Sequence, residues 1–170
     1  RGGRRLEGPC PVVAGSPTPT HTIPGLRVVH LPVRPAWLGL ILVGGSAGTA
    51  LRAWLEATFA PATGQWPWVT FAINLGGAFL LGALLEVLAQ SGRDRGWRRG
   101  MRLGLGTGLL GGFTTYSTFS VEILQLVRSD AWMVGLAYGL TSVVGGVLAA
   151  GLALRLVRRL WHHVYRRGIQ

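Results

Sequence analysis

The chain has 170 residues, a formal net charge of +11 and a mean hydropathy of +0.39. Charged residues make up only 14% of it, against about a quarter in ordinary soluble domains. They leave uncharged stretches of 17, 29, 19 and 24 residues, which follow Arg34, Glu56, Arg102 and Asp130. About 20 apolar residues let a helix cross the hydrocarbon core of a bilayer. Four such stretches exclude a soluble globular enzyme, an intrinsically disordered protein and a nucleic-acid-binding module.

Residues 1–35 are predicted to form a disordered tail rich in proline and arginine. Because each proline fixes φ and removes a backbone donor, the stretch GSPTPTHTIPG does not sustain a helix. The longest apolar stretch, PVVAG, is too short for the core of a secretory signal peptide, so we expect none here. Cys10 is the single cysteine, which excludes an internal disulfide.

Four apolar segments predict four membrane-spanning helices, over about 36–58, 67–90, 101–127 and 131–155. Together they form a transmembrane domain over residues 36–157. A basic C-terminal tail follows over 158–170, and we expect it to lie at the membrane interface. The predicted fold is an all-α, integral membrane four-helix bundle with a broken third transmembrane helix.

The basic residues are all arginine, because the chain contains no lysine. They flank the apolar segments, which favours contact with anionic lipid over contact with nucleic acid. With four spans, both termini and the loop near residues 91–102 share one side of the membrane. That side holds 15 arginines, and the other holds only Arg52 and Arg128. This bias predicts a multi-pass plasma membrane protein with both termini in the cytoplasm.

The third predicted span contains a candidate helix break. Gly111 and Gly112 are followed by FTTYSTFS, in which six hydroxyl side chains compete for backbone hydrogen bonds. A kink at this point would expose carbonyl oxygens, which hold hard cations in pores. The alternative is that the glycines only let helices approach closely and the hydroxyls only join them.

Other polar residues also lie within the apolar spans. Asn74 is costly in an apolar span unless it is hydrogen-bonded. It could join two helices, or its amide hydrogens could replace water around an anion, with Thr70 one turn earlier on the same face. Tyr138 and Ser142 lie on the same face of the last span, where they could either pack against another helix or help to form a binding site. Arg52 could be a snorkelling charge or an anion attractor at a pore mouth.

No catalytic set emerges from the sequence. It contains no Ser-His-Asp candidate, no paired carboxylates within a span, no cluster of metal ligands and no phosphate-binding loop. Glu122 follows the hydroxyl-rich cluster, where it could cap a vestibule or mark the interface. We therefore do not expect an enzyme.

Four motifs resemble those of the fluoride ion channel family, Fluc or CrcB. They are GGSAGTALR at 44–52, TFAINLGGAFLLG at 70–82, GTGLLGGFTTYSTFSVE at 106–122 and YGLTS in the fourth span. The resemblance covers about residues 36–155. It implies a passive channel that exports cytoplasmic fluoride through an antiparallel dimer with two narrow pores. It also implies a structural sodium ion at the dimer centre, held by the main-chain carbonyls of Gly111 and Thr114.

The resemblance assigns a set of residues to the fluoride pore. Two aromatic positions are phenylalanines in the family, and Tyr116 departs from that pattern while Phe119 keeps it. The ring edge of a tyrosine still carries the positive part of the quadrupole, so contact with an anion could survive. The implied pore residues are Asn74, Tyr116, Phe119, Thr70, Ser117, Tyr138, Ser142 and Arg52.

Family members that insert in both orientations have balanced charges on the two sides of the membrane, whereas the arginines of this chain lie mostly on one side. We hypothesise that this subunit inserts one way only and pairs with an oppositely oriented homologue rather than with itself.

Two other functions stay open. A small proton-coupled multidrug-type exporter also uses four spans, but it needs a carboxylate within the membrane, and the acidic residues here lie near span ends. The second alternative is a structural membrane subunit that transports nothing.

Overall fold

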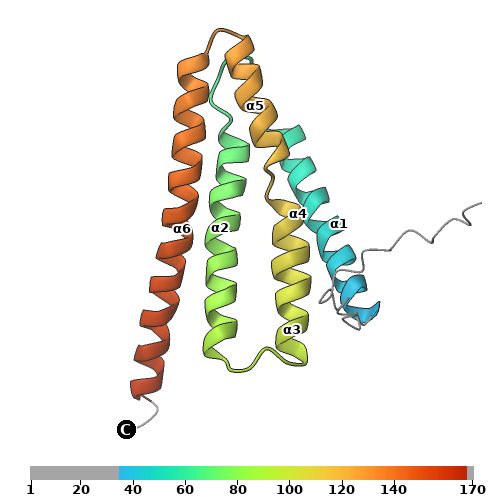
Figure 1. Ribbon diagram of the computed structural model, residues 1–170, viewed down its shortest axis with the longest axis vertical. Helices are drawn as coiled ribbons and strands as arrows, with labels where there is room; N and C mark the ends of the chain where they lie inside the picture. The colour runs from blue at the N-terminus through green and yellow to red at the C-terminus, as the bar shows by residue number, and fades with distance from the viewer. Residues whose placement is uncertain (1–34, 168–170) are drawn as a thin grey trace, which may run out of the picture. The chain divides into compact units, whose positions relative to one another are not determined.

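The computed structural model describes residues 35–167, with side chains up to residue 163. This part of the chain is helical and has no strands. Its three long helices are α1 (Pro35–Thr58), α2 (Trp68–Gln90) and α6 (Trp132–Arg167). Along the chain, α2 is followed by α3 (Trp97–Met101), η1 (Arg102–Leu110), α4 (Gly111–Phe113) and α5 (Ser117–Arg128), and then by α6. In Figure 1, α2 lies between α6 and the segment that contains α3 and α4. The tail predicted over 1–35 lies, apart from Pro35, outside the described residues.

Three helices are long and apolar enough to cross a membrane: Pro35–Thr58, Trp68–Gln90 and Trp132–His163. The expectation of an all-α protein is therefore confirmed, and three of the four predicted spans are long apolar helices. The last helix is longer than its predicted span, since α6 runs on to Arg167. Residues 152–167 contain neither glycine nor proline, so nothing in the sequence stops the helix near residue 155.

The third segment is interrupted, as the hydroxyl-rich run led us to expect. Helix α4 ends at Phe113, and Thr114 has extended backbone angles of φ −76° and ψ 154°. Helix α5 begins at Ser117. The glycine pair stays helical, and the chain leaves the helix only at the hydroxyl residues after it.

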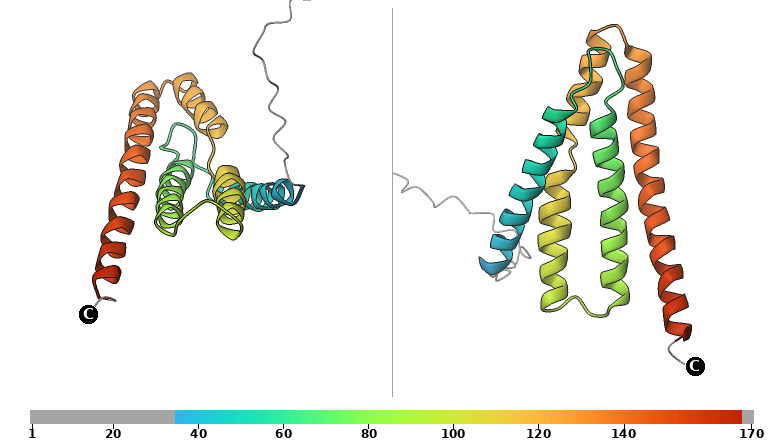
Figure 2. Two further views of the ribbon diagram at one scale, coloured as in Figure 1. Left: turned by 60° about the horizontal axis from the view of Figure 1, so that its bottom comes forward. Right: turned by 180° about the vertical axis from the view of Figure 1, so that it is seen from behind.

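The break changes the partners of the segment. Before it, η1 and α4 pack against α1, and after it α5 packs against α6 (Figures 1 and 2). Helix α2 packs mainly against α6, and it also contacts η1 and α5. The interruption thus lets one segment pack against helices on two sides of α2.

Small residues allow α1 to approach the first half of this segment closely. A Cβ atom on Gly48 would collide with the Leu109 carbonyl oxygen, and one on Gly112 would collide with the Gly45 carbonyl oxygen. The backbone of η1 forms wider π-helical turns, shown by the Gly111 N–H bonded to the Gly106 carbonyl. Such turns are rare and concentrate at functional sites.

Candidate functional site

Asn74 of α2 holds the backbone at the break. Its Nδ2 donates to the Thr115 carbonyl at 3.0 Å, and its Oδ1 accepts the Thr115 N–H at 2.9 Å. Thr115 is buried, so these two backbone groups would otherwise lack partners at a cost of about 1–3 kcal/mol each. The side chain therefore replaces the helical hydrogen bonds that Thr115 gives up. Its second amide hydrogen is not used by this pair.

Two backbone carbonyls lose the N–H partners that they would have in a continuous helix. In a continuous helix the Gly111 carbonyl would accept the Thr115 N–H, but that N–H donates to Asn74. The Thr114 carbonyl would accept the Thr118 N–H, but that N–H donates to the Thr115 hydroxyl at 3.1 Å. Gly111 and Thr114 line one pocket together with Asn74. Both carbonyls thus lose the partner that a continuous helix would give them, at residues that line the same pocket.

Arg52 supports the break from the side of α1. Its Nε donates to the Gly112 carbonyl at 3.4 Å, and its Nη1 donates to the Thr118 hydroxyl at 3.3 Å. Glu56 orients the guanidinium through a 3.2 Å ion pair, and the Thr49 hydroxyl also donates to the Gly112 carbonyl. Arg52 thus bridges the two helices on either side of the break.

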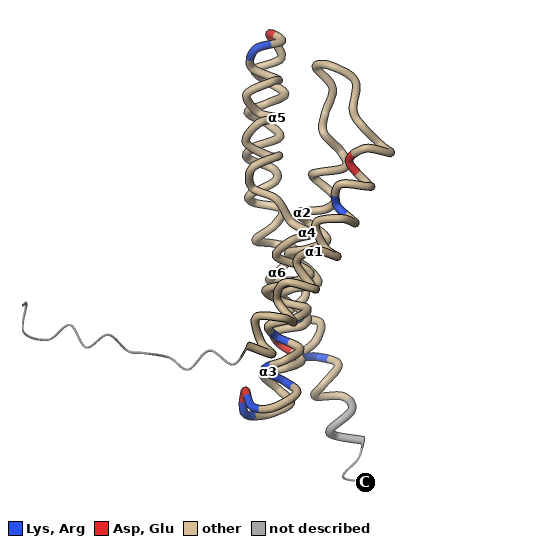
Figure 3. Tube along the Cα trace, turned by 90° about the vertical axis from the view of Figure 1, so that its right-hand side faces the viewer, with Lys and Arg blue, Asp and Glu red and all other residues tan. Residues whose placement is uncertain are grey.

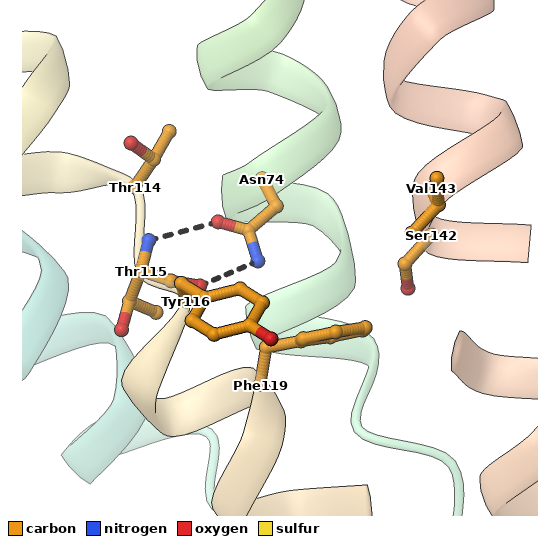
Figure 4. Close-up of a pocket in the computed structure, with 7 residues that line it drawn as sticks. All are labelled: Asn74, Thr114, Thr115, Tyr116, Phe119, Ser142 and Val143. Atoms are coloured by element: carbon orange, nitrogen blue, oxygen red, sulfur yellow. Dashed lines mark hydrogen bonds between the residues drawn. The ribbon is translucent and has the colours of Figure 1, made fainter. Parts of the chain in front are cut away.

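A pocket of about 280 Å³ opens beside the break (Figure 4). Four of the predicted pore residues line it: Asn74, Tyr116, Phe119 and Ser142. Thr114, Thr115 and Val143 complete the lining. The Ser142 hydroxyl is buried and has no hydrogen-bond partner within the described part of the chain. A buried hydroxyl without a partner is costly, so it points to a polar occupant of this pocket.

Two aromatic rings lie at the edge of the pocket. The Tyr116 and Phe119 ring centroids are 6.1 Å apart, and Tyr116 is 81% exposed. Figure 4 shows both rings beside the Asn74 amide. Their edges carry the positive part of the ring quadrupole, so the pocket offers donors and ring edges but no fixed negative charge.

Thr70 and Tyr138 form a second cluster, around Glu122. The Thr70 hydroxyl donates to Glu122 Oε1 at 2.6 Å, and the Tyr138 hydroxyl donates to Glu122 Oε2 at 2.7 Å. Both donors are fully buried. The Phe119 and Tyr138 rings lie 5.2 Å apart, which joins this cluster to the pocket. The two hydroxyls share one carboxylate and do not line the pocket itself.

The remaining predicted residue, Ser117, lies 3.2 Å from the Thr115 hydroxyl, outside the lining of the pocket. The sequence did not single out Thr115, whose backbone is the partner of Asn74. Nor did it reveal that Glu122 accepts both buried hydroxyls. One signal was available: Glu122 follows Phe119 by three residues, so the two share a face of α5.

Comparisons with known proteins identify the family of this chain. Residues 39–154 match the family described as "CrcB-like protein, Camphor Resistance (CrcB)". "Fluoride-specific ion channel FluC 1" of Cutibacterium acnes is 48% identical over 133 residues, covering 78% of this chain and 93% of the relative. "Fluoride-specific ion channel FluC 1" of Mycolicibacterium paratuberculosis is 41% identical, covering 72% and 91%. "Fluoride-specific ion channel FluC 2" of Leifsonia xyli is 48% identical, covering 68% and 80%. The chain therefore belongs to the CrcB-like family.

Proposed function

We propose that this chain forms a fluoride-selective, passive ion channel that lets fluoride leave the cytoplasm. The relatives are named as ion channels, which agrees with the expectation that the chain is not an enzyme. The observation that carries the proposal is the buried Ser142 hydroxyl, which finds no partner among residues 35–163 and lies in a pocket with Asn74 and Phe119.

The chemistry of the pocket suits a small, strongly hydrated anion. Burying a charge without compensating hydrogen bonds is prohibitive. Ser142 supplies one hydroxyl donor, and Asn74 keeps one amide hydrogen beyond its bond to Thr115. The edges of Tyr116 and Phe119 add weaker positive surfaces. The inside-negative potential drives the anion outward by about 2.3 kcal/mol per 100 mV.

The proposed channel has four spans and two subunits. The interrupted segment from α3 to α5 is the fourth crossing. Asn74 and the Thr115 hydroxyl satisfy the N–H groups that leave the helix at the break, and the carbonyls of Gly111 and Thr114 then need a ligand of their own within a membrane. Tyr116 lies at the pocket and is 81% exposed, so a second subunit would close this edge. The partner is an antiparallel copy or an oppositely oriented homologue, and the one-sided arginines favour the homologue.

A sodium ion is part of the proposal. The Gly111 and Thr114 carbonyls fit such an ion, because the N–H groups that a helix would give them donate to Asn74 and Thr115 instead. Backbone carbonyl oxygens are ligands for hard cations. Bound there, the ion would offset part of the charge of a nearby anion.

The test is fluoride efflux from liposomes, followed with a fluoride electrode. Ser142→Ala should lower efflux several-fold. The neighbouring variant Thr141→Val should not, since the Thr141 hydroxyl bonds back to the Ala137 carbonyl at 2.6 Å within its own helix. Chloride should pass far more slowly than fluoride.

The same assay separates the alternatives. Efflux from this chain alone supports a homodimer, and silence that a second homologous subunit restores supports a heterodimer. Efflux that requires a proton gradient would instead identify a proton-coupled exporter. Equal efflux from wild-type and Ser142→Ala liposomes would remove the pocket from the pathway.

A further inference from the structure

A band of arginines, most of them exposed, lies at one end of the helices, in the segment after α2 and on α6. Arg158 of α6 bonds Glu86 of α2 through Nε at 2.8 Å and Nη2 at 3.2 Å. This places the end of α2, the loop after it and the last third of α6 at the same level, and Figure 3 shows the basic residues gathered there. We call this band the basic collar; it comprises Arg93, Arg95, Arg98, Arg99, Arg102, Arg155, Arg158 and Arg159.

The collar carries a large uncompensated charge. Among the described residues, only Arg102 and Arg158 of the collar pair with carboxylates, those of Asp94 and Glu86. Eight arginines and these two carboxylates leave a net charge of +6. The other end of the helices has a net charge of −1, from Arg52, Glu56, Glu122, Arg128 and Asp130. The collar therefore repels itself unless anions lie against it.

Apolar side chains lie among the collar arginines. Trp97 is 65% exposed, Leu160 is 64% exposed and Trp161 is 38% exposed. On α6, Arg155 and Arg159 are one turn apart, and so are Leu156 and Leu160. A soluble anion needs only the arginines, whereas a lipid presents a phosphate and acyl chains together. Exposed tryptophans beside arginines match the headgroup level of a bilayer.

We propose that the basic collar binds the phosphate headgroups of anionic phospholipids. Arginine suits this role because its planar guanidinium pairs with phosphate through two parallel hydrogen bonds. Two groups of arginines are available, Arg93, Arg95 and Arg99 in the loop region and Arg155 and Arg159 on α6. Their guanidiniums are not used by the ion pairs that hold α6 to α2. This binding holds one end of the subunit at an anionic membrane face.

The test compares lipids added to the full chain in a neutral detergent. Phosphatidylglycerol should raise the melting temperature more than phosphatidylcholine at the same mole fraction. Native mass spectrometry should show retained phosphatidylglycerol. The triple variant Arg93→Gln/Arg95→Gln/Arg99→Gln should lower the apparent affinity for phosphatidylglycerol about tenfold or more. Arg128→Gln, at the other end, should leave it unchanged.

A second variant and a second anion complete the experiment. Arg155→Gln/Arg159→Gln should also weaken phosphatidylglycerol binding, which protects the test if the triple variant folds poorly. Inorganic phosphate at the same concentration should not reproduce the shift in melting temperature. The proposal is overturned if phosphatidylcholine or inorganic phosphate stabilises the chain equally. It is also overturned if a folded collar variant binds phosphatidylglycerol as wild type does.

Discussion

Each of the four long helical segments carries a pair of adjacent glycines, yet only one of them is interrupted. The pairs are Gly44-Gly45 in α1, Gly76-Gly77 in α2, Gly111-Gly112 in the third segment and Gly145-Gly146 in α6. The first, second and fourth pairs lie inside continuous helices. A glycine pair therefore does not by itself break a helix in this protein.

The residues after each glycine pair make the difference. After Gly76-Gly77 the chain continues AFLL, and after Gly145-Gly146 it continues VLAA. After Gly44-Gly45 it continues SAGT, where the Thr49 hydroxyl donates to Gly112 on the other segment. After Gly111-Gly112 it continues FTTYSTFS. In the third segment the Thr115 hydroxyl takes the Thr118 N–H, and Asn74 takes both backbone groups of Thr115. In this protein a long helical segment is interrupted only where side chains such as Asn74 and Thr115 take over its backbone hydrogen bonds.

The largest expected effect comes from removing Asn74. Asn74→Leu leaves the buried N–H and carbonyl of Thr115 without partners, at a cost of about 2 kcal/mol or more in folding free energy. Fluoride efflux should fall by at least about tenfold, because the pocket also loses its amide donor. A fluoride electrode and a thermal melt measure the two effects.

The matched control is an amide elsewhere on the same helix. Gln90 of α2 donates to Glu86 at 2.8 Å, far from the break, so Gln90→Leu should keep efflux near the wild-type rate. If Asn74→Leu and Gln90→Leu have the same efflux and the same melting temperature, then the bonds from Asn74 are not the reason that the third segment is interrupted while the other helices are continuous.

The second expected effect tests close packing beside the break. Gly48→Ala would place a Cβ against the Leu109 carbonyl oxygen, and the helices must then separate at a cost of about 1–3 kcal/mol. Gly39→Ala lies on the same helix with no atom within 4 Å. It should be neutral, or stabilising by up to about 1 kcal/mol through helix propensity. Thermal unfolding of both variants checks the difference, and an equal loss in both would remove the packing argument.

The third expected effect concerns Arg52, which contacts both sides of the break. Arg52→Gln should lower fluoride efflux about fivefold, corresponding to about 1 kcal/mol. Because the lost contacts are partly buried, the decrease should be the same at low and high ionic strength. A decrease that disappears in concentrated salt would instead indicate steering of the anion by an exposed charge.

The smallest expected effect is at Tyr116. Tyr116→Phe keeps the ring edge beside Phe119 and removes only a hydroxyl, so efflux should change by no more than about twofold. Tyr116→Ala removes the ring and should lower efflux further. A large gain in Tyr116→Phe would show that the hydroxyl slows conduction.

Much of the fold could be predicted because its signals are local. Helix α1 ends at Thr58 and α2 begins at Trp68, at or within one residue of prediction, because PATGQWP between them is rich in turn residues. The interruption after Gly112 was predicted from its hydroxyl residues. The π-helical turns of η1 and the continuation of α6 were not predicted, since η1 depends on packing against α1 and the end of α6 carries no stop signal.

The site was predictable only in part, because side-chain partners come from distant parts of the chain. Asn74 stands out as an amide in an apolar span, but its bond to Thr115 joins residues that are 41 positions apart. Thr70 and Tyr138 were grouped with the pore residues, whereas the structure places their hydroxyls on Glu122. Spacing along one helix shows which residues share a face and not which residue on another helix they meet.

Asn74 and Thr114 line both of two pockets, one that also contains Ser142 and one that also contains Gly111. A single amide therefore borders both spaces, and any rotation that improves its contact with an occupant on one side disturbs the other. Thermodynamic linkage makes such an influence equal in both directions. If the proposed sodium and fluoride ions occupy these two spaces, the binding of one would therefore change the affinity for the other by the same factor in each direction.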